Sequence, residues 1–272
     1  MKLPRPGQVA LLLAVSLDAL ACGEVVTVQT HAGTTTRYAL VAPQGATATL
    51  VLLPGGNGHA DLDARGCAQK LKGNSLIRSQ ALFHREGLAT ALVDAPSDHT
   101  GAEGLGGFRA QAAHAEDLGK VVADLRARLK LPVWLAGTSR GAISAANAAG
   151  RLSGPAAPDG VVLTSPVTVG TTGGRMAWTA QTVQDAPLER ISLPLLLVGH
   201  AADACLRSPP SGLPGIAQRV KGSRVQSVTV TGGPGARQSG LAACEGRSPH
   251  AFVDQEPEVA AGIARFVRGA GY

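Results

Sequence analysis

The feature that most constrains the fold is a series of short apolar segments that alternate with helical patterns along the chain. Apolar runs typical of buried strands occupy residues 47–53, 88–95, 132–136, 161–164, 193–198 and 225–230. Helical patterns occupy residues 80–87, 108–129, 142–149 and 257–267. Continuous apolar strands that alternate with helices are typical of a parallel sheet with helices on both faces. We therefore expect an α/β fold whose central sheet is mostly parallel.

The region before these segments has a different pattern. Residues 25–31 and 35–43 alternate apolar and polar side chains and flank the turn Ala32-Gly33-Thr34. This pattern predicts an antiparallel hairpin at the N-terminal edge of the sheet. A chain of 272 residues is within reach of one α/β domain, so we expect a single domain over residues 22–272. The segment between the strand at 161–164 and Leu193 is too short for a large lid domain.

Residues 1–21 are typical of a secretory signal peptide. Two basic residues precede a short apolar run at 9–17, and the sequence "ALA" at 19–21 provides a small-residue cleavage site. The apolar run is too short to cross a bilayer, so we expect a cleaved protein that is periplasmic or secreted. Cys22 directly after the cleavage site leaves a lipid anchor on that cysteine as the alternative, which Asp18 fits poorly.

The charge of the chain does not indicate a nucleic-acid partner. The formal net charge is +6, but the lysines and arginines are scattered rather than clustered, and only 3% of the residues are aromatic. A nucleic-acid surface usually gathers its basic residues on one face and adds aromatic rings that stack on bases. We therefore expect a small-molecule partner instead.

The pentapeptide "GTSRG" at residues 137–141 lies where an apolar run stops and an alanine-rich helical pattern begins. A strand that turns into a helix within one or two residues strains the backbone, and glycines on either side let the neighbouring elements approach. Such a turn exposes the central hydroxyl at the end of the sheet. We therefore predict that Ser139 is a nucleophile, for which a base, an acid and an oxyanion site are required.

The best candidate for the base is His250, in "EGRSPHAF". It follows the last predicted strand and precedes the last predicted helix, so its loop lies at the edge of the sheet where Ser139 is expected. Three other histidines, in the hairpin or inside helices, are interpreted as surface or core residues: His31, His84 and His114. His200 ends a predicted strand and is expected to line the site.

The best candidate for the acid that orients the base is Asp203, in "GHAADAC" after the strand at 193–198. The chain order is then Ser139, Asp203, His250, which is the order of the Ser-Asp-His triad on sheets of this kind. Three rival carboxylates lie after an earlier strand or beside the last helix: Asp94, Asp98 and Asp254.

The four cysteines of the mature chain predict disulfides, because their number is even and the protein is expected to be exported. Cys205 and Cys244 flank the predicted acid and base, so a bond between them would tie the two loops together. This pairing leaves Cys22 and Cys67 for a second bond. A zinc site is the alternative, but no pair has the C-x2-C spacing.

An oxyanion site requires preorganised N–H donors. We predict one from the backbone of Arg140, directly after the nucleophile, and one from the loop "PGGNG" after the strand at 47–53, with Gly56 as the first choice and Asn57 as the second. This loop also resembles a phosphate-binding turn, but no Gly-Lys-Ser/Thr follows it. Asn57, Met176 and Trp178 are expected to line the substrate pocket.

With these residues in place, the chain resembles an α/β-hydrolase, and it is similar to small exported bacterial members of the dienelactone-hydrolase and feruloyl or polyester-esterase groups. The resemblance covers roughly residues 47–268 and rests on "LLPGGNGH", "GTSRG", "GHAADAC" and "CEGRSPHAF". It implies Ser139 as nucleophile, Asp203 as orienting acid and His250 as base, with oxyanion donors from Gly56 and Arg140. The sequence departs from the family pattern just before this glycine loop, where a proline stands in place of the His-Gly of many members.

The resemblance implies a serine esterase that acts on small-molecule esters and needs no metal and no organic cofactor. Two further activities use the same triad, namely those of a peptidase and of a thioesterase. A non-catalytic periplasmic binding protein with this fold is a different class of function, and a phosphate or nucleotide binder that uses "PGGNG" is another.

Overall fold

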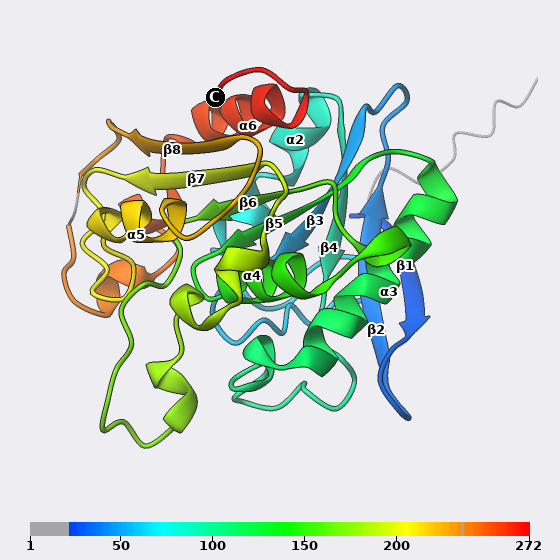
Figure 1. The fold of residues 1–272 in the computed structure, drawn as a ribbon, viewed down its shortest axis with the longest axis horizontal. Helices are drawn as coiled ribbons and strands as arrows, with labels where there is room; N and C mark the ends of the chain where they lie inside the picture. Colours follow the sequence, from blue (N-terminus) through cyan, green and yellow to red (C-terminus); the bar gives the residue numbers. More distant parts are fainter. Residues whose placement is uncertain (1–21, 236) are drawn as a thin grey trace, which may run out of the picture.

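The computed structural model describes residues 22–235 and 237–272, so the predicted signal peptide at 1–21 lies outside the described residues. The eight strands of the sheet follow the order β1-β2-β4-β3-β5-β6-β7-β8 (Figure 1). Their bounds are β1 Glu24–Gln29, β2 Thr35–Val41, β3 Ala48–Leu53, β4 Leu88–Val93, β5 Val133–Thr138, β6 Gly160–Thr164, β7 Leu195–His200 and β8 Val225–Val230. β1, β2 and β4 pair in antiparallel fashion, and every pairing from β4 to β8 is parallel. The predicted hairpin and mostly parallel sheet are confirmed.

The α-helices of the described residues are α1 Ser75–Arg78, α2 Gln80–Arg85, α3 Ala112–Leu129, α4 Gly141–Arg151, α5 Leu213–Ala217 and α6 Glu256–Val267. The first five lie between strands, and α6 follows β8. Single 3-10 turns fill most of the longer loops: η2 Phe108–Ala110, η3 Gly154–Ala156, η4 Ala177–Ala180, η5 Val183–Asp185, η6 Leu188–Arg190, η7 Pro210–Gly212, η8 Ala242–Cys244 and η9 Pro249–Ala251. Among the described helices, none is long and apolar enough to cross a membrane.

The helix predicted over residues 108–129 is interrupted in the structure. A 3-10 turn comes first, and α3 begins only after Gln111, whose backbone is extended with φ −79° and ψ 154°. The side-chain amide of Asn147 donates to the carbonyls of Arg109 and Gln111, at 3.0 and 2.7 Å. The extended backbone at Gln111 interrupts the helix, and the amide of Asn147 stabilises this break. The periodicity of the sequence contains no sign of it.

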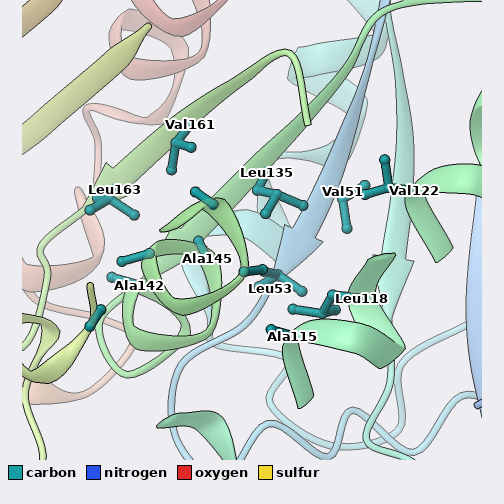
Figure 2. Close-up of a cluster of buried hydrophobic side chains, with 14 of the residues drawn as sticks. Val51, Leu53, Ala115, Leu118, Val122, Leu135, Ala142, Ala145, Val161 and Leu163 are labelled. Carbon is teal, nitrogen blue, oxygen red and sulfur yellow. The ribbon is translucent and has the colours of Figure 1, made fainter. Parts of the chain in front are cut away.

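Alternate residues of the strands face opposite layers of the core. Val51 and Leu53 of β3 pack in the cluster that includes α3 and α4, together with Leu118, Leu135, Ala142, Ala145, Val161 and Leu163 (Figure 2). Leu50 and Leu52 of the same strand belong to the second cluster, together with side chains of α2 and α6. Both faces of the sheet are therefore covered by helices, and the ligand edge is left to the loops at the strand ends.

α3 buries a histidine. The side chain of His114 is 3% exposed, packs edge-on against Phe108 at 5.2 Å, and has no hydrogen-bond partner at either ring nitrogen. Burial, together with the positive charge of Arg109, lowers the pKa of His114 to about 3. The interpretation of this residue as a core histidine agrees with its position.

We expect His114 to make the protein less stable in acid. Its pKa in the folded chain is below the value of about 6.5 in the unfolded chain, so between these two values only the unfolded chain binds the proton. The free energy of unfolding should fall as the pH falls through this window, by up to about 1.4 kcal/mol per pH unit from this residue. In urea titrations from pH 7 to 4, His114→Leu should flatten this slope. Equal slopes for the two proteins would contradict the prediction.

Candidate active site

Ser139 occupies the turn between β5 and α4 with a left-handed backbone, φ 53°. This conformation is uncommon for a residue with a side chain, and such strain concentrates at functional turns. Glycine is required on either side of this serine because a Cβ at either position would clash with the backbone. A Cβ on Gly141 would lie 2.0 Å from the carbonyl oxygen of Leu53, and one on Gly137 would lie 2.4 Å from that of Gly141. The sharp turn expected from the pentapeptide is therefore present.

His250 and Asp203 form a buried pair. His250 lies in η9, Asp203 follows β7, and Nδ1 of the histidine is 2.9 Å from Oδ2 of the aspartate. The side chains are 4% and 1% exposed. The other carboxylate oxygen accepts the backbone N–H of Cys205 at 2.9 Å, and the hydroxyl of Ser165 donates to the backbone carbonyl of His250 at 2.8 Å. Because a carboxylate only accepts, Nδ1 of His250 carries the proton and Nε2 presents its lone pair.

Ser139 and His250 line the same cavity, whose volume is about 320 Å³. Nε2 of the histidine is buried and makes no hydrogen bond within residues 22–235 and 237–272. The other lining residues come from the loop after β3, the segment around α1, the end of β5 and the loop before η9: Gly55, Gly56, Leu71, Gly73, Asn74, Ser75, Thr138, Cys244, Glu245, Gly246 and Ala251. The unpaired ring nitrogen and the serine are therefore available to one bound molecule.

The glycine loop after β3 lies against the serine. A Cβ on Gly55 would be 2.9 Å from Cβ of Ser139, so the loop backbone passes close to this serine. Gly56, the first choice for an oxyanion donor, lines the cavity and has φ 58°. Within the described parts of the chain, neither the N–H of Gly56 nor that of Arg140 donates a hydrogen bond. Both amides are free for a developing oxyanion.

A buried arginine that the sequence did not single out holds this loop in place. Arg109 is 1% exposed, and its guanidinium donates to the carbonyls of Pro54 and Gly56, at 3.1 and 3.4 Å, and to the hydroxyl of Ser144 at 2.8 Å. Burial lowers the pKa of Arg109 to about 9. The arginine therefore connects the glycine loop to α4, the helix that follows Ser139. No local pattern marks it, because its partners lie far away in the sequence.

Arg78 binds several residues of the cavity wall. Its guanidinium donates to the carbonyls of Gly73, Gly246 and Ala251, the last at 3.0 Å, and pairs with Glu256. In the structure its donors are used to join the segment before α1 to the loop that carries the histidine, which is a positioning role.

Two disulfides are present, Cys22–Cys67 and Cys205–Cys244. These are the predicted pairs. A cysteine in a disulfide has no thiol left to carry a lipid, so the first bond disfavours the anchor considered for Cys22. The second bond links Cys205, whose backbone N–H binds Asp203, to Cys244, which lines the cavity.

We expect the second disulfide to support both stability and turnover. Replacing Cys205 and Cys244 with serine opens a loop that spans 39 residues, which should cost about 4 kcal/mol. It should also lower kcat by up to about 100-fold, because the acid and base loops are no longer tied. The control is the Cys22→Ser/Cys67→Ser variant, which opens a loop of similar length, 45 residues, and whose cysteines do not line the cavity. It should lose similar stability in thermal unfolding and keep its kcat; an equal loss of kcat in both variants would contradict the role of the clamp.

Four residues expected around the substrate lie outside this cavity. Asn57 binds within its own loop and to the carbonyl of Ala102 at 3.3 Å. Met176 is exposed, and the ring of Trp178 lies under the guanidinium of Arg140 at 3.8 Å. His200 is buried at the end of β7, and its Nδ1 accepts the N–H of Ala202 at 3.0 Å. Burial also lowers the pKa of His200.

The rival acids have other partners. The carboxylate of Asp94 is buried and accepts the backbone N–H groups of Ala60, Leu62 and Ala95, at 2.7 to 2.9 Å, so it shapes the loop that follows the glycines. Asp98 contacts His31, in the turn of the hairpin, and its neighbour His99. Neither aspartate lines the cavity that contains Ser139.

No family model matches the sequence, and no curated protein matches it. Solved structures do match. A dienelactone hydrolase from Anabaena variabilis is 19% identical, with a TM-score of 0.56 over 89% of this chain and 93% of its own. An α/β serine hydrolase without a lid from Xanthomonas campestris is 18% identical, with a TM-score of 0.55 over 90% and 93%. Est1E from Butyrivibrio proteoclasticus is 14% identical, with a TM-score of 0.57 over 90% and 98%. Together with the strand order, these similarities show that the chain has the α/β-hydrolase fold.

Proposed function

We propose that the chain is a serine hydrolase that cleaves small carboxylic esters. The observation that carries the proposal is the buried pair of His250 and Asp203, 2.9 Å apart, together with the cavity that His250 and Ser139 both line. Nε2 of His250 makes no hydrogen bond in the described chain. This is the arrangement of nucleophile, base and orienting acid that activates a serine hydroxyl. The fold similarity to esterases and serine hydrolases supports the same reaction class.

The proposed reaction has two steps. In the first step His250 takes the proton of Ser139 while the hydroxyl oxygen attacks the ester carbonyl. The oxyanion that develops is bound by the N–H groups of Gly56 and Arg140, and the alcohol leaves with the proton from the imidazolium. In the second step His250 activates a water that attacks the acyl-enzyme. The acid product and the free serine are then released.

The size of the cavity supports a small acyl or alcohol group. Its volume of about 320 Å³ is at the low end of the range for small-molecule sites. No large lid covers it, since the segment between β6 and β7 contains only 3-10 turns. Two of the similar structures are consistent with an ester of modest size, a dienelactone hydrolase and Est1E, which was also solved with ferulic acid bound.

The test is hydrolysis of p-nitrophenyl esters from acetate to dodecanoate by the chain that begins at Cys22. The proposal predicts turnover that is highest for the short acyl groups and falls for the long ones, because the cavity is small. A thioester and a peptide anilide assayed beside the esters distinguish the thioesterase and peptidase alternatives. Absence of turnover on all esters would contradict the proposal, and absence of turnover on the thioester and the anilide as well would leave a binding protein.

We further propose that the protein acts outside the cytoplasm. Both disulfides support an oxidising compartment, since cytosolic thiols are normally kept reduced. A non-reducing peptide map of the protein recovered from the periplasm or the medium tests this. The expected result is the two bonds and a mature N-terminus at Cys22; a reduced cytosolic protein that retains residues 1–21 would contradict it.

A further inference from the structure

A second cluster of titratable side chains lies away from the serine cavity. His31 is in the turn between β1 and β2, and Asp98 and His99 are in the loop after β4. In the described chain, one ligand atom from each of these three residues lies within 4.8 Å of the other two. Nε2 of His31 is 2.9 Å from Oδ2 of Asp98, and Nε2 of His99 is 3.9 Å from the same oxygen. None of the three lines the cavity of Ser139.

The opposite nitrogens of the two rings have fixed partners. Nδ1 of His31 is 2.6 Å from Oδ2 of Asp117, a carboxylate of α3 that is 2% exposed. Nδ1 of His99 is 3.2 Å from the backbone carbonyl of Gly104. A carbonyl and a carboxylate only accept, so both Nδ1 atoms carry the proton. Nε2 of His31 makes a hydrogen bond to Oδ2 of Asp98, which places a second proton on this ring, and the hydrogen bonds to Asp98 and Asp117 raise the pKa of His31. The lone pair on Nε2 of His99 is 3.9 Å from the same oxygen.

Without metal, the proton on Nε2 of His31 offsets the negative charge of Asp98. A divalent cation bound here would replace that proton and attract all three ligand atoms. Histidines that ligate a metal almost always donate their other N–H to a carboxylate or a backbone carbonyl, which fixes the ring and the tautomer. Asp117 and Gly104 are partners of these two kinds. Phe108 also holds both rings, stacked on His99 at 4.2 Å and tilted against His31 at 5.3 Å, and it is 6% exposed.

We propose that His31, Asp98 and His99 form a binding site for a divalent transition metal, with Zn²⁺ as the fitting ion. Ligand atoms around a tetrahedral zinc are roughly 3.3 Å apart, given bonds of about 2.0–2.1 Å. The two separations of 2.9 and 3.9 Å lie on either side of this value, and the third is at most 4.8 Å, so side-chain rotations would bring the three atoms to tetrahedral spacing. Asp98 is 45% exposed, which leaves the fourth position open to water. Bound metal would tie the hairpin turn to the loop after β4, and through Asp117 to α3.

The test uses untagged mature protein, stripped of metal and titrated calorimetrically with Zn²⁺. The expected result is one ion per chain at this site, with thermal unfolding raised by roughly 5–10 °C when free zinc is 100 times Kd. Loss of a partner of a metal-binding histidine typically weakens a site 10- to 100-fold, and loss of a ligand should cost at least as much. Asp98→Asn and His99→Gln should therefore each weaken binding by about 100-fold or more, with circular dichroism to show that the variants are folded.

Two controls locate the ion. His84→Gln, in α2, should bind zinc like the wild-type protein. His250→Asn should do so too, because Cys205, which lies near Asp203 and His250, is in a disulfide and offers no thiolate. Three results would overturn the proposal. The first is no zinc binding, in which case the contact of His31 with Asp98 is an ordinary ion pair. The second is binding that Asp98→Asn and His99→Gln leave unchanged, and the third is binding lost only in His250→Asn. Since none of these readouts depends on ester turnover, the proposal and the proposed hydrolase can fail independently.

Discussion

Replacing Ser139 with alanine is expected to lower kcat for p-nitrophenyl esters by about 10⁶-fold, with little change in KM. Loss of the nucleophile removes the acyl-enzyme route entirely, and removal of a triad nucleophile typically has an effect of this size. The residual rate should come from the oxyanion donors and the cavity alone. The fold should persist, because the change deletes one oxygen at a position whose backbone conformation already accommodates a Cβ.

The matched control is Ser211→Ala, an exposed serine in η7 that does not line the cavity. It should match the wild-type kcat and KM. A Ser139→Ala enzyme that retains most of the wild-type kcat would contradict the assignment of the nucleophile. So would a control variant that loses activity to the same degree.

Replacing Asp203 with asparagine is expected to lower kcat by about 10⁴-fold. The aspartate is 1% exposed. One of its carboxylate oxygens accepts Nδ1–H of His250, and the other accepts the backbone N–H of Cys205. An asparagine keeps the shape but presents an N–H₂ group to one of these donors. The histidine then adopts the other tautomer, with its lone pair on Nδ1 and a proton on Nε2, and is unable to accept the serine proton.

Asp254→Asn provides the comparison, since Asp254 is an exposed carboxylate close to the same loop that the sequence offered as a rival acid. It has a left-handed backbone, φ 61°, which asparagine tolerates. Its kcat should remain at the wild-type level. If Asp254→Asn were the more damaging variant, the acid would be misassigned.

The fold and much of the candidate site were accessible from the sequence because their signals are local. The alternation of apolar runs and helices predicted the sheet, and "GTSRG" between a strand and a helix predicted the turn at Ser139. Chain order then suggested Asp203 and His250, which the structure brings together at 2.9 Å. Their catalytic roles stay predictions.

The residues that position the site were not accessible, because their contacts join distant parts of the chain. Arg109 is 53 and 55 residues from Gly56 and Pro54, and Arg78 is 168 residues from Gly246. An arginine in a helical pattern normally indicates a solvated face. Only the folded chain shows that Arg109 is buried. The carboxylate that holds His31 is likewise 86 residues away, so no spacing pattern marks that cluster.

Labelling with a fluorophosphonate probe, followed by peptide mass spectrometry, tests the central claim most directly. The serine that attacks the probe is the one activated by a base, and trypsin would release Ser139 in the peptide 131–140. The account predicts one label per chain, on this peptide, with labelling slowed by roughly 10²- to 10⁴-fold in His250→Asn. A label on another residue, or equal labelling of the wild-type and Ser139→Ala proteins, would contradict it.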